Sequence, residues 1–320
     1  MISVSSCDSS TKYFIVDEFC LNCWRKLSRE EIQKYENLRL DHEKMIEHFK
    51  RINLEIELEE RLKRTQVIDF VRKLSVDDIP KKDLFVIQSQ IFAKTDEESP
   101  QYVPAEISLA RFSLSEGIIE VYHAFIRPGT VPLGYKRACL ENSAKKHKIP
   151  LELVSEADGD TTGSEHGKYT EDGEILDQMM NILNGEHFLF SLPEFEKEIT
   201  GVLEVLKKRS GRELSSVNIL SLPLLMFELA NKPRSEGSEA QKQEGFIPFE
   251  SVAEREFEKE KFLYYPGMNC SWHDEMTDTC NCSSTRVRSY VYTLLDVCCH
   301  RYNIHLFPVT HYPPLPALPS

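Results

Sequence analysis

Two short runs decide the fold: EISLARFSL (residues 106–114) and GIIEVYHAFI (residues 117–126). Both are rich in aliphatic and aromatic residues, and only Ser115 and Glu116 separate them, so they predict an antiparallel hairpin. Pro128 and Gly129 follow and end the second strand. Upstream, DLFVIQSQIF (residues 83–92) predicts a further strand.

Helical and strand patterns alternate after the hairpin. HFLFSL (residues 187–192) predicts a buried strand, and EFEKEITGVLEVLKKR (194–209) predicts an amphipathic helix. The acidic stretch 152–177 is expected to be a loop, and EILDQMMNIL (174–183), which overlaps its end, predicts a helix. TRVRSYVYTLLDVCC (285–299) has apolar residues at helical spacing and predicts a closing helix. This order predicts an α/β domain with a mixed sheet flanked by helices.

The N-terminal part of the chain predicts a helix. Residues 28–62 contain no Pro and no Gly, and Ser28 with Glu31 fits a capping box. Leu54, Ile56 and Leu58 alternate as in a strand, but the charged flanks favour helix. We therefore expect a helical region over residues 1–82, an α/β domain over 83–312 and a disordered proline-rich tail over 313–320.

Composition restricts the classes of partner. With 39 Lys and Arg against 52 Asp and Glu, the net charge is −13, which argues against a protein coated in duplex nucleic acid. No apolar run reaches the roughly 18 residues of a membrane-spanning helix, so no membrane partner is expected. The first residues, MISVSSCDSSTKY, do not resemble a secretion signal. The nine cysteines are therefore expected to be reduced thiols, some of them on a metal.

The segment CSWHDEMTDTCNC (residues 270–282) carries the sharpest chemical signal. Cys270 and His273 have C-x2-H spacing, and Cys280 and Cys282 follow closely. Thiolate and imidazole are ligands that Zn²⁺ prefers, and a fourth ligand could come from this segment or from a carboxylate elsewhere. The alternative, that these cysteines are ordinary loop residues, has similar weight on spacing alone.

Catalytic motifs are mostly absent, and no catalytic residue is assigned. Two-metal nucleases need converging carboxylates, often two residues apart on the first central strand. Glu106 has Ser at position 108, so this set is incomplete. Single-stranded nucleic acid could contact a basic stretch that contains one aromatic ring. The residues of this stretch are Arg127, Tyr135, Lys136, Arg137, Lys145, Lys146 and Lys148. That these side chains form only a solvated surface is as plausible.

Residues 105–150 resemble the opening of the Maelstrom domain. That family shows a Glu on its first core strand, then SL-x-EGI, FH-x-FI-x-PG-x-(I/V)P-x-G and HKIP, and here the match includes Glu106, Glu116-Gly117-Ile118, His123 and residues 147–150. A second hallmark, C-x2-H followed by Cys before the final helix, matches Cys270, His273 and Cys282. The resemblance covers roughly residues 83–312.

The resemblance implies an RNase H-like fold related to DnaQ-type exonucleases. It also implies a structural Zn²⁺ held by Glu106, Cys270, His273 and Cys282, which ties the first core strand to the last helix. Cys280 competes for the last place, and alignment of the closing helix favours Cys282. The family acts in the PIWI-interacting RNA (piRNA) pathway, binds RNA and silences transposons in the germline. It implies partners among single-stranded RNA and small-RNA pathway proteins, and residence in perinuclear germ granules and the nucleus.

Two further expectations follow from the same family. Its members usually begin with an HMG box, and part of such a box resembles a run of this chain that contains Trp24, Leu27, Glu30, Glu31, Lys34 and Tyr35. The resemblance therefore implies a shortened or divergent box at the N-terminus, for which duplex-DNA binding is doubtful. Cleavage of single-stranded RNA has been ascribed to the domain. The alternative function is therefore an active single-stranded RNA endonuclease or a metal-dependent exonuclease.

Overall fold

A computed structural model describes residues 28–96, 99–151, 169–212, 217–233, 246–275 and 281–314. The chain divides into two compact units, Met1–Arg61 and Leu62–Ser320. Trp24, Leu27 and Cys280 lie outside the described residues, as do residues 152–168 and the tail from 315.

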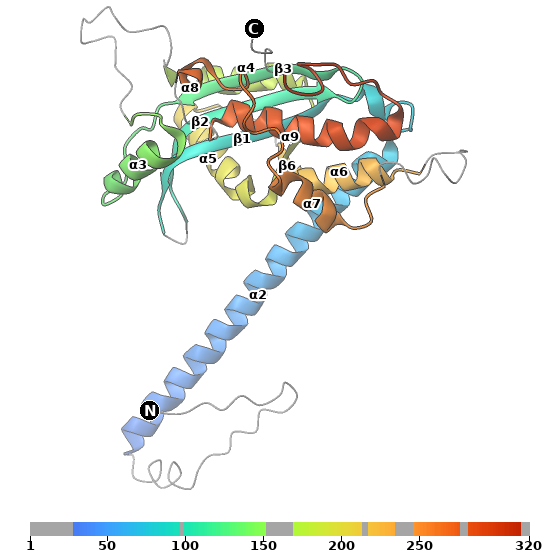
Figure 1. Ribbon diagram of the computed structural model, residues 1–320. Coiled ribbons are helices and arrows are strands. Elements are labelled where there is room, and N and C mark those ends of the chain that lie inside the picture. Colours follow the sequence, from blue (N-terminus) through green and yellow to red (C-terminus); the bar gives the residue numbers. More distant parts are fainter. Residues whose placement is uncertain are drawn as a thin grey trace, which may run out of the picture. The chain divides into compact units, whose positions relative to one another are not determined.

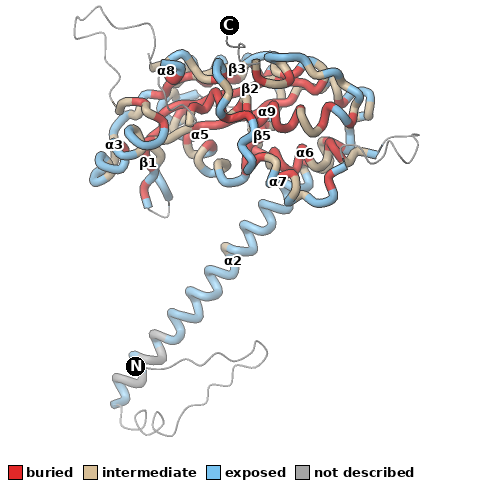
Figure 2. The backbone as a smooth tube through the Cα atoms, viewed as in Figure 1, coloured by how far each residue is buried: buried red, intermediate tan, exposed pale blue. Residues whose placement is uncertain are grey.

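The N-terminal helix is confirmed. Helix α2 (Arg29–Lys73) begins directly after Ser28 and continues without a break through residues 54–58, so the alternation of Leu54, Ile56 and Leu58 does not mark a strand. These three side chains are exposed, as Figure 2 shows for this part of α2. Near its C-terminal end α2 buries Val67 and Val71 in the core of the second unit.

The second unit is built on one six-stranded mixed sheet, which confirms the predicted α/β class. The strand order is β4-β3-β2-β1-β5-β6. The first three strands pair antiparallel, while β5 and β6 run parallel to β1, and β4 runs parallel to β3. Their bounds are Leu84–Lys94 (β1), Tyr102–Ser113 (β2), Gly117–Ile126 (β3), Tyr169–Thr170 (β4), Phe188–Ser191 (β5) and Asn218–Ser221 (β6).

The predicted hairpin is strands β2 and β3, and both faces of this sheet are covered. On β2, Ile107 and Leu109 pack into the core beneath α4 (Asp172–Leu183) and α5 (Glu196–Ser210). Residues of the other parity, Ala110 and Phe112, pack into the core on the opposite face. Because side chains alternate along a strand, Glu106 and Ser108 belong to the second of these faces.

Helix α9 (Ser283–Cys298) covers the face of the sheet that Glu106 shares, and it contacts β1, β2 and β3. Figure 1 shows it lying along the strands. Helices α6 (Leu222–Asn231) and α7 (Glu250–Glu258) pack on the same side. The first residue of α9 follows Cys282, so α9 brings the cysteine-rich segment to the sheet.

One local prediction, the extent of the acidic loop, needs correction. The helix predicted over residues 174–183 is α4, but it begins two residues earlier, so that Asp172 lies with Glu174 in its first turn and not in the acidic loop. Acidic side chains stabilise a helix N-terminus by opposing its dipole, so the charge that suggested a loop favours the helix start.

Candidate metal centre

Four side chains from distant parts of the sequence converge beside the N-terminus of α9. The carboxylate of Glu106, the imidazole of His123 and the sulfurs of Cys270 and Cys282 offer ligand atoms that all lie within 4.8 Å of one another. Three of them were predicted as metal ligands. The fourth, His123, was a motif residue without an assigned role.

Regular elements position these groups. Glu106 and His123 lie on neighbouring strands, where Glu106 pairs with Phe125 and Ser108 with His123. Cys270 is the N-cap of the short helix α8 (Ser271–Asp274), and Cys282 is the N-cap of α9. The backbone N–H of Cys270 points at the sulfur of Cys282 at 3.5 Å.

The prediction that Glu106 lies on the first core strand is wrong. The first strand is β1, at the centre of the sheet, and Glu106 lies on β2, opposite Gln90. A carboxylate pair two residues apart on the first central strand would therefore fall on β1. This strand, LFVIQSQIFAK, contains Gln88 and Gln90 but no Asp or Glu.

The carboxylate of Glu106 is fully buried and accepts two hydrogen bonds. Its Oε1 accepts from the backbone N–H of Ser283, in the first turn of α9, at 2.7 Å. Its Oε2 lies 2.7 Å from Nε2 of His123. The helix N-terminus favours negative charge, so the buried carboxylate is stabilised even before any cation is considered.

His273 adjoins the cluster and is itself buried. Its Nδ1 lies 3.0 Å from the sulfur of Cys270, and its Nε2 lies 2.6 Å from the backbone carbonyl oxygen of His147. A carbonyl only accepts hydrogen bonds, so Nε2 carries the proton and donates it. His273 therefore presents Nδ1 toward the sulfurs.

The two thiols and the imidazole of His273 share their protons unequally. The hydrogen bond with Cys282, together with burial, raises the pKa of the Cys270 thiol. Burial alone would raise the pKa of Cys282, but hydrogen bonds from Cys270 and His273 bring it well below its ordinary value. Burial lowers the pKa of His273, yet the bond with Cys282 and the charge of Glu106 outweigh it and raise the pKa to about 9. Without a cation, then, only one sulfur readily ionises.

The donor set fits Zn²⁺. Two sulfurs, an imidazole nitrogen and a carboxylate oxygen are ligands of structural zinc sites, and metal-bound histidines usually donate the other ring N–H to a carbonyl or carboxylate. His273 does so to His147. A divalent cation would also compensate the buried negative charges of Glu106 and the thiolates, which are otherwise costly to desolvate.

The predicted nucleic-acid contacts fall into two groups, one next to β3 and one on and around α3. Arg127, at the end of β3, faces Glu171 at 3.6 Å. The others belong to helix α3 (Lys136–Asn142), the π-helical turn Ser143–His147 or their flanks. Glu141 pairs with Arg137 at 2.9 Å and with Lys145 at 3.9 Å.

Tyr135 is less available for base stacking than its sequence context suggests. Its ring packs against a small apolar cluster, and its hydroxyl accepts a hydrogen bond from the backbone N–H of Asp96 at 3.0 Å. The basic stretch is joined to the candidate metal centre, because the carbonyl oxygens of Lys146 and His147 accept hydrogen bonds from Asn281 and His273.

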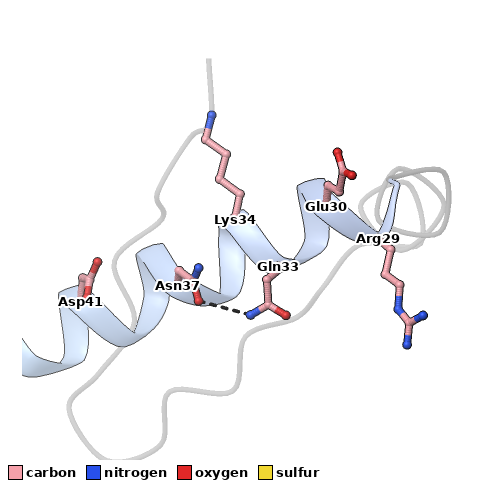
Figure 3. Close-up of a pocket in the computed structure, with 6 residues that line it drawn as sticks. All are labelled: Arg29, Glu30, Gln33, Lys34, Asn37 and Asp41. Atoms are coloured by element: carbon pink, nitrogen blue, oxygen red, sulfur yellow. Dashed lines mark hydrogen bonds between the residues drawn. The ribbon is translucent and has the colours of Figure 1, made fainter.

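A separate hollow of about 750 Å³ lies beside the first turns of α2 (Figure 3). Its described lining comes from one helix: Arg29, Glu30, Gln33, Lys34, Asn37 and Asp41. These six side chains mix both charges and do not converge on one point in Figure 3, so we assign no function to this hollow. No helix in the described parts of the chain is long and apolar enough to cross a membrane.

Fold and site define an RNase H-like α/β domain with a buried cluster of nitrogen, oxygen and sulfur donors. A family model described as "Maelstrom: piRNA pathway germ-plasm component" matches residues 96–316. The chain therefore belongs to the Maelstrom family, as the sequence motifs predicted.

Curated relatives agree with this assignment. The chain is 22% identical over 266 residues to a protein maelstrom homolog of Culex quinquefasciatus, covering 80% of this chain and 48% of the relative. It is 24% identical over 321 residues to protein maelstrom 1 of Drosophila ananassae, covering 92% and 72% of the two chains. A segment of 60 residues is 43% identical to a protein maelstrom homolog of Xenopus tropicalis, covering 19% and 14%.

Proposed function

We propose that this chain is an RNA-binding protein of the piRNA pathway that acts in germline transposon silencing, with a structural Zn²⁺ in its RNase H-like domain. The match of the Maelstrom model to residues 96–316 carries the pathway assignment. Small-RNA pathway proteins are its proposed partners, and perinuclear germ granules and the nucleus its proposed location.

The proposed zinc ligands are Glu106, Cys270, His273 and Cys282. Bound Zn²⁺ would supply a cross-link, because four protein ligands complete a tetrahedral shell and leave no position for a reactive water. The ligands come from β2, from the α8 segment and from the start of α9. The cross-link would therefore fix the cysteine-rich segment and the last helix against the sheet.

The proposed role of the domain is to bind RNA rather than to cleave it with two metals. Two-metal nucleases hold their ions with several carboxylates, and β1 has Gln88 and Gln90 at the positions where such a pair is expected. An amide carries no charge and is a weaker ligand for divalent cations. Glu106 is the single carboxylate in the described donor cluster, whereas a two-metal site needs several.

Single-stranded RNA would contact the basic stretch through its phosphates. Lys145, Lys146 and Lys148 lie within four residues of one another on the turn that precedes the buried Ile149. Phosphate contacts release counterions, so the affinity should fall with salt in proportion to the number of contacts. We assign these lysines to backbone binding without base specificity.

The test is a titration of labelled single-stranded RNA at several salt concentrations, with the triple variant Lys145→Glu, Lys146→Glu, Lys148→Glu. Its affinity should fall about tenfold or more, and its salt slope should shrink by about two. Lys208→Glu, an exposed lysine of α5, is the matched control and should bind like the wild type. Unchanged binding by the triple variant would refute this surface, and metal-dependent cleavage of the RNA would favour the nuclease alternative.

A further inference from the structure

We propose that His123 is a positioning residue of the zinc centre: it donates its Nε2–H to Glu106 and holds that carboxylate in the orientation that binds the metal, without being a ligand itself. This inference rests on the proposed zinc site and assigns a task to a residue outside the four ligands.

The centre contains more donor groups than a tetrahedral ion can use. Glu106, His123, Cys270 and Cys282 lie within 4.8 Å of one another, and His273 contacts Cys270 at 3.0 Å. Structural Zn²⁺ sites are almost always four-coordinate, so one of these five groups is left over. The choice falls between the two histidines, because sulfur is the strongest ligand type present and Glu106 faces both sulfurs.

The hydrogen-bond partners of the two histidines separate their roles. His273 donates from Nε2 to the carbonyl oxygen of His147 at 2.6 Å, so its Nδ1, which lies 3.0 Å from the sulfur of Cys270, is the nitrogen that can give up its proton and bind a metal. His123 instead directs Nε2 at the carboxylate of Glu106 at 2.7 Å. An ionised carboxylate only accepts, so this Nε2 carries a proton and has no lone pair for a metal.

The carboxylate of Glu106 has room for both the hydrogen bonds and the metal. It can accept about four hydrogen bonds or ligand contacts, and the structure uses one on each oxygen: Ser283 N–H on Oε1 and His123 on Oε2. These two donors come from α9 and from β3. They fix the carboxylate plane from two sides, and a free lone pair stays available toward the sulfurs.

The ring of His123 is itself held in place. It packs edge-on against Phe125, with ring centroids 4.7 Å apart, and its backbone lies directly opposite Ser108 on β2. The side chain is only 14% exposed. A donor fixed in this way orients a metal ligand more firmly than a water molecule would, and such outer-shell partners commonly contribute 10–100-fold to metal affinity.

The test compares His123→Gln and His123→Ala in the full chain. The Gln amide nitrogen can take the place of Nε2 as a donor to Glu106, whereas Ala removes the donor. We measure zinc per purified chain, zinc affinity by chelator competition, and the visible spectrum of the Co²⁺-substituted protein, which reports coordination number and ligand type. Cys282→Ser is the reference for the loss of a true ligand.

For a positioning residue, His123→Gln should hold one zinc with near wild-type affinity and an unchanged Co²⁺ spectrum. His123→Ala should keep the tetrahedral spectrum but bind roughly 10–100-fold more weakly. If His123→Gln instead loses zinc and the tetrahedral bands as Cys282→Ser does, His123 is a ligand and the inference is overturned. A wild-type chain without bound metal would overturn the zinc site itself, which separates that failure from this one.

Discussion

Gly117→Ala should destabilise the domain by far more than a glycine substitution in a turn normally does. Gly117, in the EGI motif that begins β3, has a φ of +72°. An alanine in this left-handed conformation costs about 1–2 kcal/mol. In addition, a methyl group would overlap the carbonyl oxygen of Thr310 and lie 2.9 Å from Nδ1 of His311.

The overlap falls on backbone that cannot swing away like a flexible side chain. Thr310 O accepts from the N–H of Ile118 at 2.8 Å, and the buried His311 donates from Nε2 to the carbonyl oxygen of Leu114 at 3.1 Å. Displacing this C-terminal segment breaks both hydrogen bonds, at about 0.5–1.5 kcal/mol each. With the backbone cost, the free energy of unfolding should fall by about 2–5 kcal/mol.

Urea unfolding followed by circular dichroism measures this loss, and Gly211→Ala is the matched control. Gly211 has a φ of +65°, but nothing lies within 4 Å of an added methyl group, so only the backbone cost of about 1–2 kcal/mol applies. Equal destabilisation by the two variants would refute the reasoning, because the contact with residues 310–311 would then contribute nothing.

The remaining predictions concern titration, packing and the metal. Burial raises the pKa of Glu198 from 4.5 to about 7. Between these two pH values the folded chain therefore binds more protons than the unfolded chain. The free energy of unfolding should fall by up to about 3 kcal/mol as the pH rises through this range. Glu198→Gln should flatten that fall in urea unfolding measured from pH 4.5 to 8, and an equally steep curve would contradict it. Gly201→Ala should force the ring of Tyr102 off α5 and lower the thermal midpoint of unfolding. In Gly185→Ala nothing lies within 4 Å of the added methyl group, so the midpoint should fall only by the cost of placing alanine at a positive φ. A strong chelator should increase hydrogen exchange at residues 281–286 while leaving β5 protected; uniform loss of protection would argue against a local cross-link.

The hairpin and the closing helix could be predicted because their signals are local. The apolar runs at 106–114 and 117–126 and the turn between them lie within a few residues, and β2 and β3 form where they predict. The helical spacing of the last apolar run likewise places α9 within about two residues of its bounds.

The first two residues of α4, Asp172 and Gly173, differ from the predicted helix start at residue 174, because a long-range charge pair stabilises them. Asp172, in the first turn, lies 2.7 Å from Arg209 at the end of α5. From sequence alone Asp172 belongs to an acidic stretch that favours a loop. The partner 37 residues away becomes visible only when the two helices pack side by side.

The candidate metal centre could be predicted only in part, because some of its donor groups are close in the sequence and others are not. Cys270, His273 and Cys282 stand close in the sequence, so their spacing alone suggests a site, and the family motif adds Glu106. His123 has no such local signal, because its relation to Glu106 depends on the register of β2 against β3. The position of Glu106 on the second strand already follows from the order of the predicted strands, with 83–92 before 106–114, and the pairing of β1 with β2 confirms it.

The central claim is that one Zn²⁺ joins β2 to the start of α9, and counting zinc in purified protein by mass spectrometry tests it most directly. The account predicts one zinc per chain in the wild type and in Cys280→Ser, and none in Cys282→Ser or Glu106→Ala. A wild type without zinc, or a Cys282→Ser variant that keeps its zinc while Cys280→Ser loses it, would contradict the assignment.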